Sequence, residues 1–474
     1  MEVTSMFLNR MMKTRTGLYR LYSTLKVPHV EINGIKYKTD PQTTNVTDSI
    51  IKLTDRSLHL KESHPVGILR DLIEKKLNSV DNTFKIFNNF KPVVTTMENF
   101  DSLGFPKDHP GRSKSDTYYI NETHLLRTHT SAHELECFQK IRNDSDNIKS
   151  GFLISADVYR RDEIDKTHYP VFHQMEGATI WKRTKADVGV KEPMYIEKIR
   201  EDIRQVENLL NKENVKITVD DDTIPLKENN PKQEYMSDLE VDLCSQHLKR
   251  SIELIVSEVF NKKISSMIKN KANNTPKELK VRWINAYFPW TAPSWEIEVW
   301  WQGEWLELCG CGLIRQDVLL RAGYKPSETI GGAFGLGLDR IAMLLFEIPD
   351  IRLLWSRDER FSRQFSKRLI TSFKPYSKHP GSFRDVAFWL PEDKPDIHQV
   401  HENDLMEIIR NIAGDLVESV KLVDSFTHPK TGRKSMCYRI NYQSMDRNLT
   451  NAEVNTLQDM VCSKLVKEYS VELR

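Results

Sequence analysis

One charged stretch, YRRDEIDKTHYPVFHQMEG at positions 159–177, contains groups that could bind the phosphates of a nucleotide. Arg160 and Arg161 directly follow a strand-like run. An arginine that points from the end of a strand into a cleft offers a planar fork that matches phosphate oxygens. The carboxylates of the following loop would partly neutralise Arg161 and keep the loop solvated. A surface ion pair between Arg160 and one of these carboxylates is the alternative interpretation.

The strand that returns from this loop carries side chains that suit a ring and an ammonium group. Phe172 offers a flat face, and Gln174 and Glu176 alternate with Met175. Because successive side chains of a strand point to opposite faces, both polar groups lie on the same side of the sheet as Phe172. An amide and a carboxylate on a concave sheet surface can hold an ammonium group. A solvated face of the hairpin is the alternative.

A second segment, GGAFGLGLDR at positions 331–340, contains four glycines where the backbone must pack closely. Arg340 follows them in the first turn of a predicted helix. The spacing fits neither the GxGxxG fingerprint of a dinucleotide-binding fold nor the GxxxxGK[ST] phosphate-binding loop. The segment therefore adds a second arginine without indicating a Rossmann fold or a P-loop.

Apolar runs with strand character predict the elements that position these groups. Strands at 151–159 and 170–181 are joined by the polar stretch 160–169, so they form an antiparallel hairpin with a long loop. Extended chain is also expected at 84–96, 117–120, 281–290, 295–301 and 305–313. A helix is expected to begin at 63–66 with Ser63 as N-cap and to continue through the apolar positions of 69–77, and further helices are expected at 248–259 and 339–347. The segment 182–240 is charged and is expected to be irregular.

The last hundred residues predict a separate small domain. A strand at 383–390 is followed by a helix at 401–412, with Gly414 as its C-cap. Strands at 419–426 and 434–442 come next, a capping box at 450–453 opens a second helix, and 470–473 can form a last strand. The order βαββαβ is that of a ferredoxin-like unit.

Composition sets wider bounds. A length of 474 residues suggests two or three domains, and no apolar run is long enough to predict a transmembrane helix. The formal charge of +2 is small, so a nucleic-acid partner would need local basic patches. Six basic residues between 352 and 368 could form such a track, or a solvated connecting helix. Cys309 and Cys311 lack the CxxC spacing of a metal or redox site and are expected to be buried thiols.

The N-terminus differs from the rest of the chain. Between Val3 and Val30 it contains basic residues and no acidic residue, and Leu18, Leu21, Tyr22 and Leu25 would share one face of a helix. This pattern predicts a mitochondrial targeting peptide at 1–22, outside the fold. A frayed basic tail is the alternative.

Taken together, these motifs resemble those of class II aminoacyl-tRNA synthetases, and in particular the monomeric mitochondrial phenylalanyl-tRNA synthetases. The resemblance covers roughly 65–474, less the poorly matching 185–240. The segments that carry it are 93–119, 125–134, 157–177, 305–312 and 331–344, and 373–391 resembles the start of that family's anticodon-binding domain.

The resemblance implies an α+β protein with two domains. A class II catalytic domain at 23–350, an antiparallel sheet flanked by helices with a variable insert at 185–240, would be followed by a linker at 351–372. A ferredoxin-like anticodon-binding domain would occupy 373–474. The implied activity attaches phenylalanine to mitochondrial tRNA(Phe), first as phenylalanyl-adenylate made from ATP with Mg²⁺, then by transfer to the 3′-terminal adenosine. A monomer of the mitochondrial matrix, without a membrane association, is implied as well.

The resemblance also implies roles in ATP binding. Arg160 would bind the α-phosphate, and Asp162 stands where the family has a carboxylate. Phe172 would stack on adenine, and His168 would approach the outer phosphates. Arg340 would cover the other face of adenine and reach the γ-phosphate.

For phenylalanine, the resemblance implies two sets of residues and one metal ligand. The amino and carboxylate groups would be held by His129, Ser131, Gln174 and Glu176. The ring would be held by Phe288, Trp290 and Ala333, and Glu307 would bind magnesium. Simpler interpretations are helix capping for the first two residues, core packing for the aromatic pair, and an ordinary strand carboxylate for Glu307.

Two residues depart from the family pattern. Trp290 stands where phenylalanine is usual, which puts the pocket width in doubt, and Asp339 stands where glutamate is usual. Two other functions stay open at this point: a class II ligase for another amino acid, or an inactive paralogue kept as an RNA-binding protein. Amino-acid-dependent pyrophosphate exchange would distinguish among the three.

Overall fold

A computed structural model describes residues 28–474 except 143–146, 186–190, 214–215, 224–229, 270–277, 302, 368, 376–378 and 392–400. The predicted targeting peptide at 1–22 lies outside the described residues. Within them, no helix is both long enough and apolar enough to cross a membrane.

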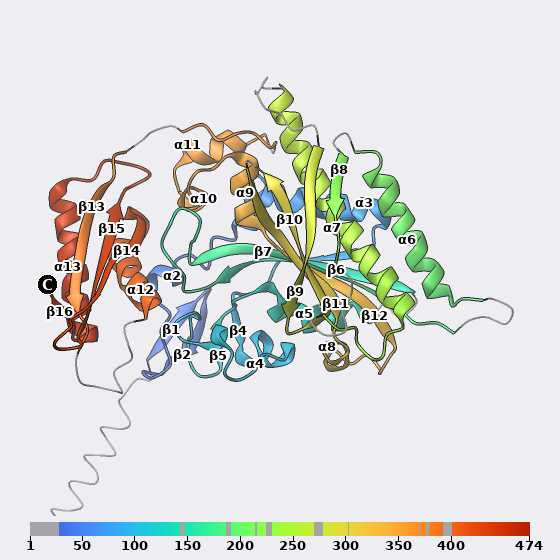
Figure 1. The fold of residues 1–474 in the computed structure, drawn as a ribbon, viewed down its shortest axis with the longest axis horizontal. Helices are drawn as coiled ribbons and strands as arrows, with labels where there is room; N and C mark the ends of the chain where they lie inside the picture. The colour runs from blue at the N-terminus through green and yellow to red at the C-terminus, as the bar shows by residue number, and fades with distance from the viewer. Residues whose placement is uncertain are drawn as a thin grey trace, which may run out of the picture.

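An eight-stranded sheet forms the centre of the larger part of the molecule (Figure 1). Neighbouring strands run antiparallel except at the two edges, where β3 pairs with β6 and β8 with β9 in parallel. The prediction of an antiparallel sheet is confirmed for its centre. In spatial order the strands are β3 (Phe84–Phe87), β6 (Lys149–Tyr159), β7 (Val171–Lys182), β12 (Thr329–Gly337), β11 (Glu304–Ile314), β10 (Thr291–Trp301), β9 (Glu278–Phe288) and β8 (Lys216–Asp220).

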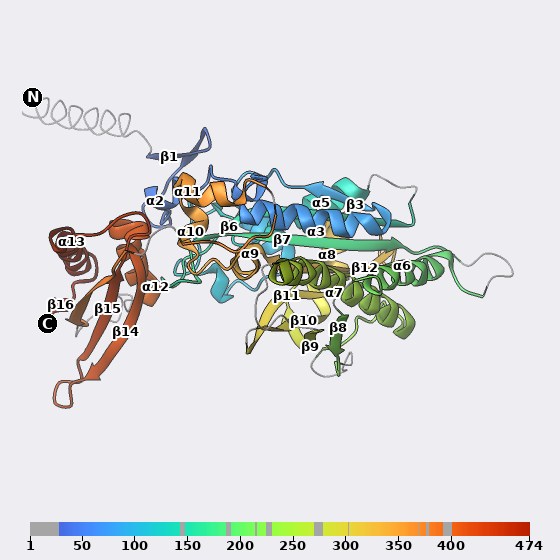
Figure 2. The ribbon, with the colours of Figure 1, turned by 90° about the horizontal axis from the view of Figure 1, so that it is seen from above.

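Helices cover one face of this sheet and enclose the main core. Helices α6 and α7 lie side by side (Figures 1 and 2), α3 packs against α7 and α9, and α9 packs against β7. Met175 and Trp181 of β7 point into this core, whereas Ala178 and Ile180 belong to a smaller apolar cluster on the opposite face. The helices are α3 (Pro65–Asp81), α6 (Met194–Leu210), α7 (Asp238–Lys269) and α9 (Leu338–Phe346).

The opposite face of the sheet is only partly covered. Helices α5 (Glu134–Arg142) and α8 (Gln316–Arg321) pack over one end of it, and the rest is open to the cavity described below. The short elements of the first half of the chain are β1 (His29–Ile32), β2 (Ile35–Lys38), α2 (Asp48–Ile51), η1 (Leu58–Leu60), β4 (Val93–Thr95), α4 (Thr96–Asn99), η2 (Asp101–Leu103), η3 (Pro110–Arg112), β5 (His124–Leu126) and η4 (Thr130–His133).

Three local predictions differ from the structure. His64, not Ser63, caps α3, because its Nδ1 accepts the N–H of Val66 and Pro65 occupies the first turn. The predicted strand at 117–120 is a buried loop with one isolated bridge, Tyr119 to Leu125. The segment 182–240 is not irregular, since it contains α6 and β8. The apolar residues of α6 that were overlooked face α7 at helical spacing: Ile196, Ile199, Ile203 and Val206.

The C-terminal part confirms the ferredoxin-like prediction. Its four strands are all antiparallel in the order β14-β15-β13-β16, and a core of its own lies between the sheet and two helices. The capping box of Thr450 and Glu453 is present at the start of α13. The elements are β13 (Ser382–Trp389), α12 (Glu402–Ala413), η6 (Gly414–Leu416), β14 (Val417–Thr427), β15 (Lys434–Tyr442), α13 (Asn451–Tyr469) and β16 (Glu472–Leu473).

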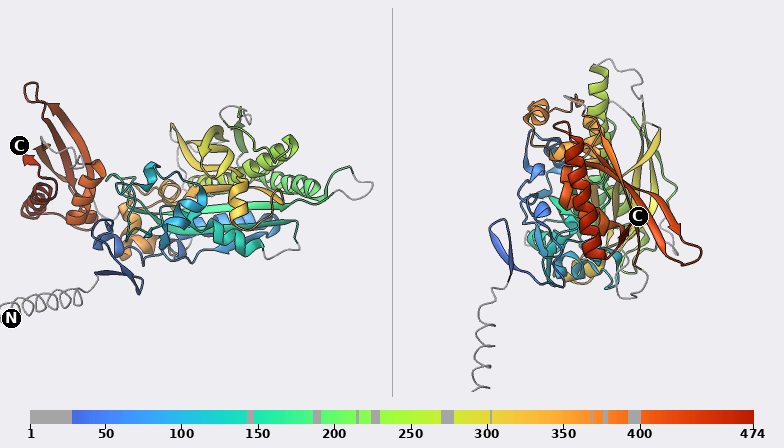
Figure 3. Two further views of the ribbon diagram at one scale, coloured as in Figure 1. Left: turned by 90° about the horizontal axis from the view of Figure 1, so that it is seen from below. Right: turned by 90° about the vertical axis from the view of Figure 1, so that its left-hand side faces the viewer.

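This domain sits at one end of the molecule, next to α2 and the β1–β2 hairpin (Figure 3). The predicted linker at 351–372 contains α10 (Arg352–Trp355), α11 (Glu359–Ser362) and η5 (Arg363–Phe365), and its aromatic side chains are buried in the main core. Three of the described arginines of this segment are paired with neighbouring carboxylates. Arg352 is buried against Asp350, while Arg360 and Arg363 pair with Asp358 and Glu359.

Candidate active site

A cavity of about 760 Å³ opens on the sheet face that carries Phe172 and Glu176. Arg160 and Arg340, which lie far apart in the sequence, both line it. All the predicted site residues except His168 are found there: His129, Ser131, Arg160, Asp162, Phe172, Gln174, Glu176, Phe288, Trp290, Glu307, Ala333 and Arg340.

Arg160 stands at the end of β6 with both its backbone and its side chain held. Its N–H donates to the carbonyl of Pro170 (3.0 Å), and its Nε donates to the carbonyl of Thr128 (2.9 Å). The guanidinium carbon lies 5.3 Å from the centre of the Phe172 ring. The side chain is exposed to the cavity, so its fork has a fixed position and an accessible face.

Arg340 reaches the same cavity from the first turn of α9. The preceding residue, Asp339, is buried. Its Oδ2 accepts a hydrogen bond from the backbone N–H of His173 (2.6 Å) and lies 2.9 Å from Nδ1 of the His173 ring. His173 directly follows Phe172 on β7, and Phe172 lies beside Arg160. This contact therefore links α9, which carries Arg340, to the strand next to Arg160. Asp339, which stands where the family usually has glutamate, therefore contacts β7 directly through His173.

The glycine-rich segment forms strand β12 and leaves space above the sheet. A Cβ added at Gly335 or Gly337 would meet no atom within 4 Å, and both residues line the cavity. A side chain at either position would project into the cavity. In contrast, a Cβ at Gly310 would lie 2.6 Å from the ring of Phe288, so that glycine gives the aromatic ring its room.

Glu176 is buried beside two hydroxyl donors. Its Oε2 accepts hydrogen bonds from Thr130 (2.9 Å) and Ser131 (2.8 Å), and Gln174 accepts the N–H of Thr130 (3.3 Å). Burial raises the pKa of Glu176 to about 7, although the two hydroxyl hydrogen bonds lower it. The result is a carboxylate held at the wall of the cavity, with a neighbouring amide, in a setting suited to an ammonium group.

A second carboxyl group, Glu134, lies behind Glu176. It is 1% exposed, and neither of its oxygens has a hydrogen-bond partner among the described residues. Burial and the charge of Glu176 raise the pKa of Glu134 well above its ordinary value. Because two adjacent buried charges repel each other, ionisation of Glu176 disfavours ionisation of Glu134.

Aromatic rings gather at the far end of the cavity. The ring of His129 is stacked on Phe105 (5.6 Å between centres) and on Trp290 (5.9 Å), and Trp290 lies 6.0 Å from Phe288. Burial, followed by the positive charge of Arg160, lowers the pKa of His129 to about 3, so the ring is neutral at pH 7. Ala333 is buried between β11 and β7 at the floor. Together these residues form an apolar recess of the kind that accepts a ring.

His168 does not line this cavity, so its predicted contact with the outer phosphates of ATP is not supported. It lies in the loop between β6 and β7, where its Nδ1 is 2.8 Å from Asp165 Oδ2, and it lines a separate cavity of about 260 Å³ beside the C-terminal domain. The hydrogen bonds that Asp165 Oδ1 accepts from the N–H groups of Thr167 and His168 fix the turn of the loop, and Asp165 and His168 both line the second cavity.

Glu307 lines the cavity from β11 and is exposed. It pairs across the sheet with Glu298, and its charge contributes to the raised pKa of Glu296. Mg²⁺ is usually held by one or two carboxylates together with substrate phosphates. The donor set at this wall therefore fits a magnesium ion.

Several residues of the cavity wall were missed by the sequence analysis. Phe105 belongs to a polar loop with no periodic pattern, and Asp116 ends the same loop. Thr130 stands between two predicted residues, and its hydroxyl could have been included on that ground. Asn403 comes from α12 of the C-terminal domain, and no local signal in the sequence points to it.

Two known families match the chain. The family described as the class II core domain (F) of tRNA synthetases matches residues 50–197 and 215–365. The family described as the ferredoxin-fold anticodon-binding domain matches residues 377–474.

Curated relatives match over nearly the whole length. The mitochondrial phenylalanine–tRNA ligase of Dictyostelium discoideum is 36% identical, with 98% of this chain and 98% of the relative covered. The mitochondrial enzyme of Mus musculus is 38% identical over 94% of this chain and 89% of its own. The chloroplastic/mitochondrial enzyme of Arabidopsis thaliana is 38% identical over 98% and 90%.

Proposed function

Since this chain belongs to the phenylalanine–tRNA ligase family of class II tRNA synthetases, we propose that its main cavity activates phenylalanine with ATP. The observation that carries this proposal is that Arg160, Arg340 and Glu176 all open onto one cavity, with an aromatic recess at its far end. The two arginines suit the triphosphate of ATP, and the carboxylate of Glu176 suits the α-ammonium group of phenylalanine.

Activation needs no nucleophile from the protein. A carboxylate oxygen of phenylalanine attacks the α-phosphorus of ATP, the bond to the β-phosphate oxygen breaks, and pyrophosphate leaves. Arg160 neutralises charge at the α-phosphate and Arg340 at the outer phosphates. Magnesium bound at Glu307 would supply further positive charge there. The protein therefore accelerates the step by positioning and by electrostatic stabilisation of the transition state.

The second step transfers the acyl group to tRNA(Phe). A ribose hydroxyl of the 3′-terminal adenosine attacks the carbonyl carbon of phenylalanyl-adenylate, and AMP leaves. Glu176 and Gln174 hold the α-ammonium group of phenylalanine during both steps. The recess of Phe288, Trp290 and Ala333 holds the phenyl ring. The indole of Trp290 lies against the ring of His129, which keeps this wider side chain at the edge of the recess.

Pyrophosphate exchange tests the activation step. Exchange should depend on phenylalanine and not on other amino acids, and Arg160→Ala should lower its rate by about 10²–10³-fold, as expected for the loss of one charge-stabilising donor. Exchange that depends on a different amino acid would assign the chain to another class II ligase. Exchange that survives Arg160→Ala unchanged would refute the mechanism.

For tRNA, we propose that the open face of the C-terminal sheet contacts the anticodon loop. The Trp389 ring lies 6.2 Å from Phe426 and from His428, and the guanidinium groups of Arg433 and Arg474 each lie 5.5 Å from its centre. Unpaired bases stack on aromatic and guanidinium planes. Trp389→Ala should lower aminoacylation of tRNA and leave pyrophosphate exchange unchanged; equal loss of both activities would argue against this face.

The relatives named as mitochondrial support a mitochondrial protein, and we propose that it acts in the matrix as a monomer. Fusion of residues 1–30 to a fluorescent protein tests the targeting segment, and sedimentation of the purified protein tests the oligomeric state. Cytosolic fluorescence or a dimer would contradict these two statements.

A further inference from the structure

We propose that Asn403, a residue of the C-terminal domain, is a positioning residue of the ATP site. The C-terminal domain, docked on the catalytic domain, would fix the loop between β6 and β7 that carries Arg160 and would thereby promote formation of the adenylate. The proposal rests on the activation step proposed above and extends it to a domain otherwise assigned to tRNA.

Asn403 lines the main cavity and ties together two segments of the catalytic domain. Its Nδ2 donates to the carbonyl of Ser115 (3.1 Å), to Asp116 Oδ1 (3.2 Å) and to the carbonyl of Arg161 (3.3 Å). All three neighbours are acceptors, so the chemistry fixes which end of the amide faces them. The N–H of Arg161 in turn donates to the carbonyl of Asp116 (2.8 Å).

The residue that Asn403 fixes directly follows the predicted phosphate-binding arginine. Arg160 is held on its own side by Thr128 and Pro170. Arg161 is held within the catalytic domain by its N–H, which donates to the carbonyl of Asp116, and by its Nη1, which donates to the carbonyl of Lys114. The Asn403 contact adds a tie from α12 to the carbonyl of Arg161, so α12 supports the position of the residue next to Arg160.

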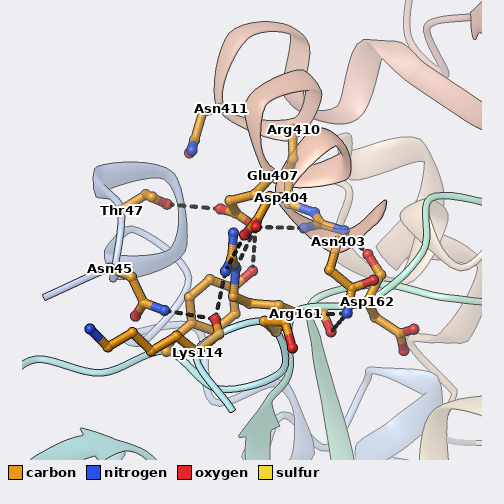
Figure 4. A network of polar contacts seen from close by, with 12 residues as sticks. Asn45, Thr47, Lys114, Arg161, Asp162, Asn403, Asp404, Glu407, Arg410 and Asn411 are labelled. Carbon is orange, nitrogen blue, oxygen red and sulfur yellow. Dashed lines mark hydrogen bonds and ion pairs between the residues drawn. The ribbon is translucent and has the colours of Figure 1, made fainter. Parts of the chain in front are cut away.

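A buried network strengthens this attachment (Figure 4). Arg161 Nη1 lies 2.9 Å from Asp404, and Arg410 donates to the carbonyl of Asp162 (2.5 Å). Glu407 joins the two arginines, with Arg410 Nη1 at 2.6 Å and Arg161 Nε at 3.9 Å. Because these charges are largely buried, removing one partner leaves another without compensation.

Among the described residues, the contacts that hold the phenylalanine end of the cavity come from the catalytic domain itself. Glu176 is held by Thr130 and Ser131 of the catalytic domain, and the aromatic recess is built from the end of β9, the β9–β10 turn and β12. A change at Asn403 should therefore affect ATP much more than phenylalanine. By reciprocity, bound ATP should also stabilise the docked domain.

The experiment compares Asn403→Asp with Asn411→Asp in the full-length protein. Both residues lie on α12 and face the catalytic domain, but Asn411 accepts a hydrogen bond from Ser49 (2.8 Å), which an aspartate can keep, and neither Asn411 nor Ser49 is among the described residues that line the main cavity. An aspartate at 403 keeps the shape, loses the donor and faces three acceptors. We expect Asn403→Asp to raise the KM for ATP in pyrophosphate exchange by about tenfold, with the KM for phenylalanine within about twofold of the wild-type value, and Asn411→Asp to match the wild type.

Asn403→Ala, which removes the donor without adding charge, should show the same split and a smaller rise in melting temperature on addition of ATP. Equal KM values for ATP in Asn403→Asp, Asn403→Ala and the wild type would overturn the proposal, and so would faster exchange in either variant, which would make the docked domain inhibitory. Absence of phenylalanine-dependent exchange in the wild-type protein would instead refute the proposed function itself.

Discussion

At the scale of single residues, the chemistry of this site depends on the different states of two buried carboxyl groups. Glu176 has hydroxyl donors and faces the cavity, whereas Glu134 has no hydrogen-bond partner among the described residues. Burial raises the pKa of both. Ionisation of the first provides the charge that binds an ammonium group, and that charge raises the pKa of the second, which disfavours two adjacent buried charges.

Phenylalanine binding should therefore depend on pH around the raised pKa of Glu176, about 7. Below that pH the carboxyl group is protonated and loses its attraction for the ammonium group, so affinity should rise from about pH 6 to about pH 8 and then level off. Titration calorimetry with phenylalanine at a series of pH values measures this. Glu176→Gln should bind weakly with no pH dependence, and Glu134→Gln should behave as the wild type because the raised pKa of Glu134 favours its neutral form.

The floor of the ring pocket gives a second prediction at this scale. Ala333 is 4% exposed and lines the cavity close to Trp290. Ala333→Gly removes one methyl group and should admit para-substituted rings, raising the exchange rate with 4-chlorophenylalanine by roughly tenfold or more relative to phenylalanine. A rate no better than that of the wild type would show that Ala333 does not face the ring.

At the scale of elements, the helical layer holds the sheet that carries the site without contacting substrate. Helix α6 packs on α7 through Ile196, Ile199, Ile203 and Val206, which are all buried. The opposite face of α6 is charged, and this high charge hid the helix from the sequence analysis.

Ile199→Ala should destabilise the fold without altering substrate binding. Ile199 is fully buried, so its truncation should lower the free energy of unfolding by about 2–5 kcal/mol. Urea denaturation measures this loss, and the KM values for ATP and phenylalanine should not change. Arg204→Ala, on the exposed side of the same helix, serves as the matched control and should change stability by less than about 0.5 kcal/mol. A normal unfolding free energy for Ile199→Ala would show that α6 is not anchored at this position.

At the scale of the whole molecule, the two domains are joined by buried polar contacts as well as by the chain. Arg352 is paired with Asp350 (2.7 Å) and donates to the carbonyls of Asp415 and Gln443 (both 2.8 Å). Tyr169 donates to Asp415 (2.8 Å). These bonds hold the ferredoxin-like domain at the end of the catalytic sheet, where α12 reaches the cavity.

Arg352→Ala should loosen this attachment, because it leaves Asp350 and two carbonyl groups without their partner. Loss of one member of a buried ion pair costs about 3–5 kcal/mol, so the radius of gyration from small-angle X-ray scattering should increase. Arg360→Ala, which removes an exposed ion pair with Asp358, is the control and should leave it unchanged. An unchanged radius of gyration for both variants would show that contacts other than those of Arg352 hold the two domains together.

The sequence alone determined those parts of the site that depend on local order. Strand alternation placed Phe172, Gln174 and Glu176 on one face, and that holds because the side chains of a strand alternate whatever the rest of the chain does. The βαββαβ order and the capping box at Thr450 were also local patterns, and both are present. The prediction that 182–240 is irregular was wrong. Charged residues on the exposed face of α6 outnumber the apolar residues that face α7, and they obscured the helical pattern.

Only the tertiary structure decided which distant groups share a cavity. His168 lies close in sequence to the site residues but lines the second cavity, where Asp165 fixes the turn of its loop. Asn403 comes to the cavity from another domain, and Arg410 reaches a carbonyl 248 residues away. Such contacts depend on how the cores of the two domains pack together, and the periodicity of one segment contains no information about that. The shared face of Phe172, Gln174 and Glu176 was a local property of one strand, but the completion of the phosphate-binding end depends on packing between the domains.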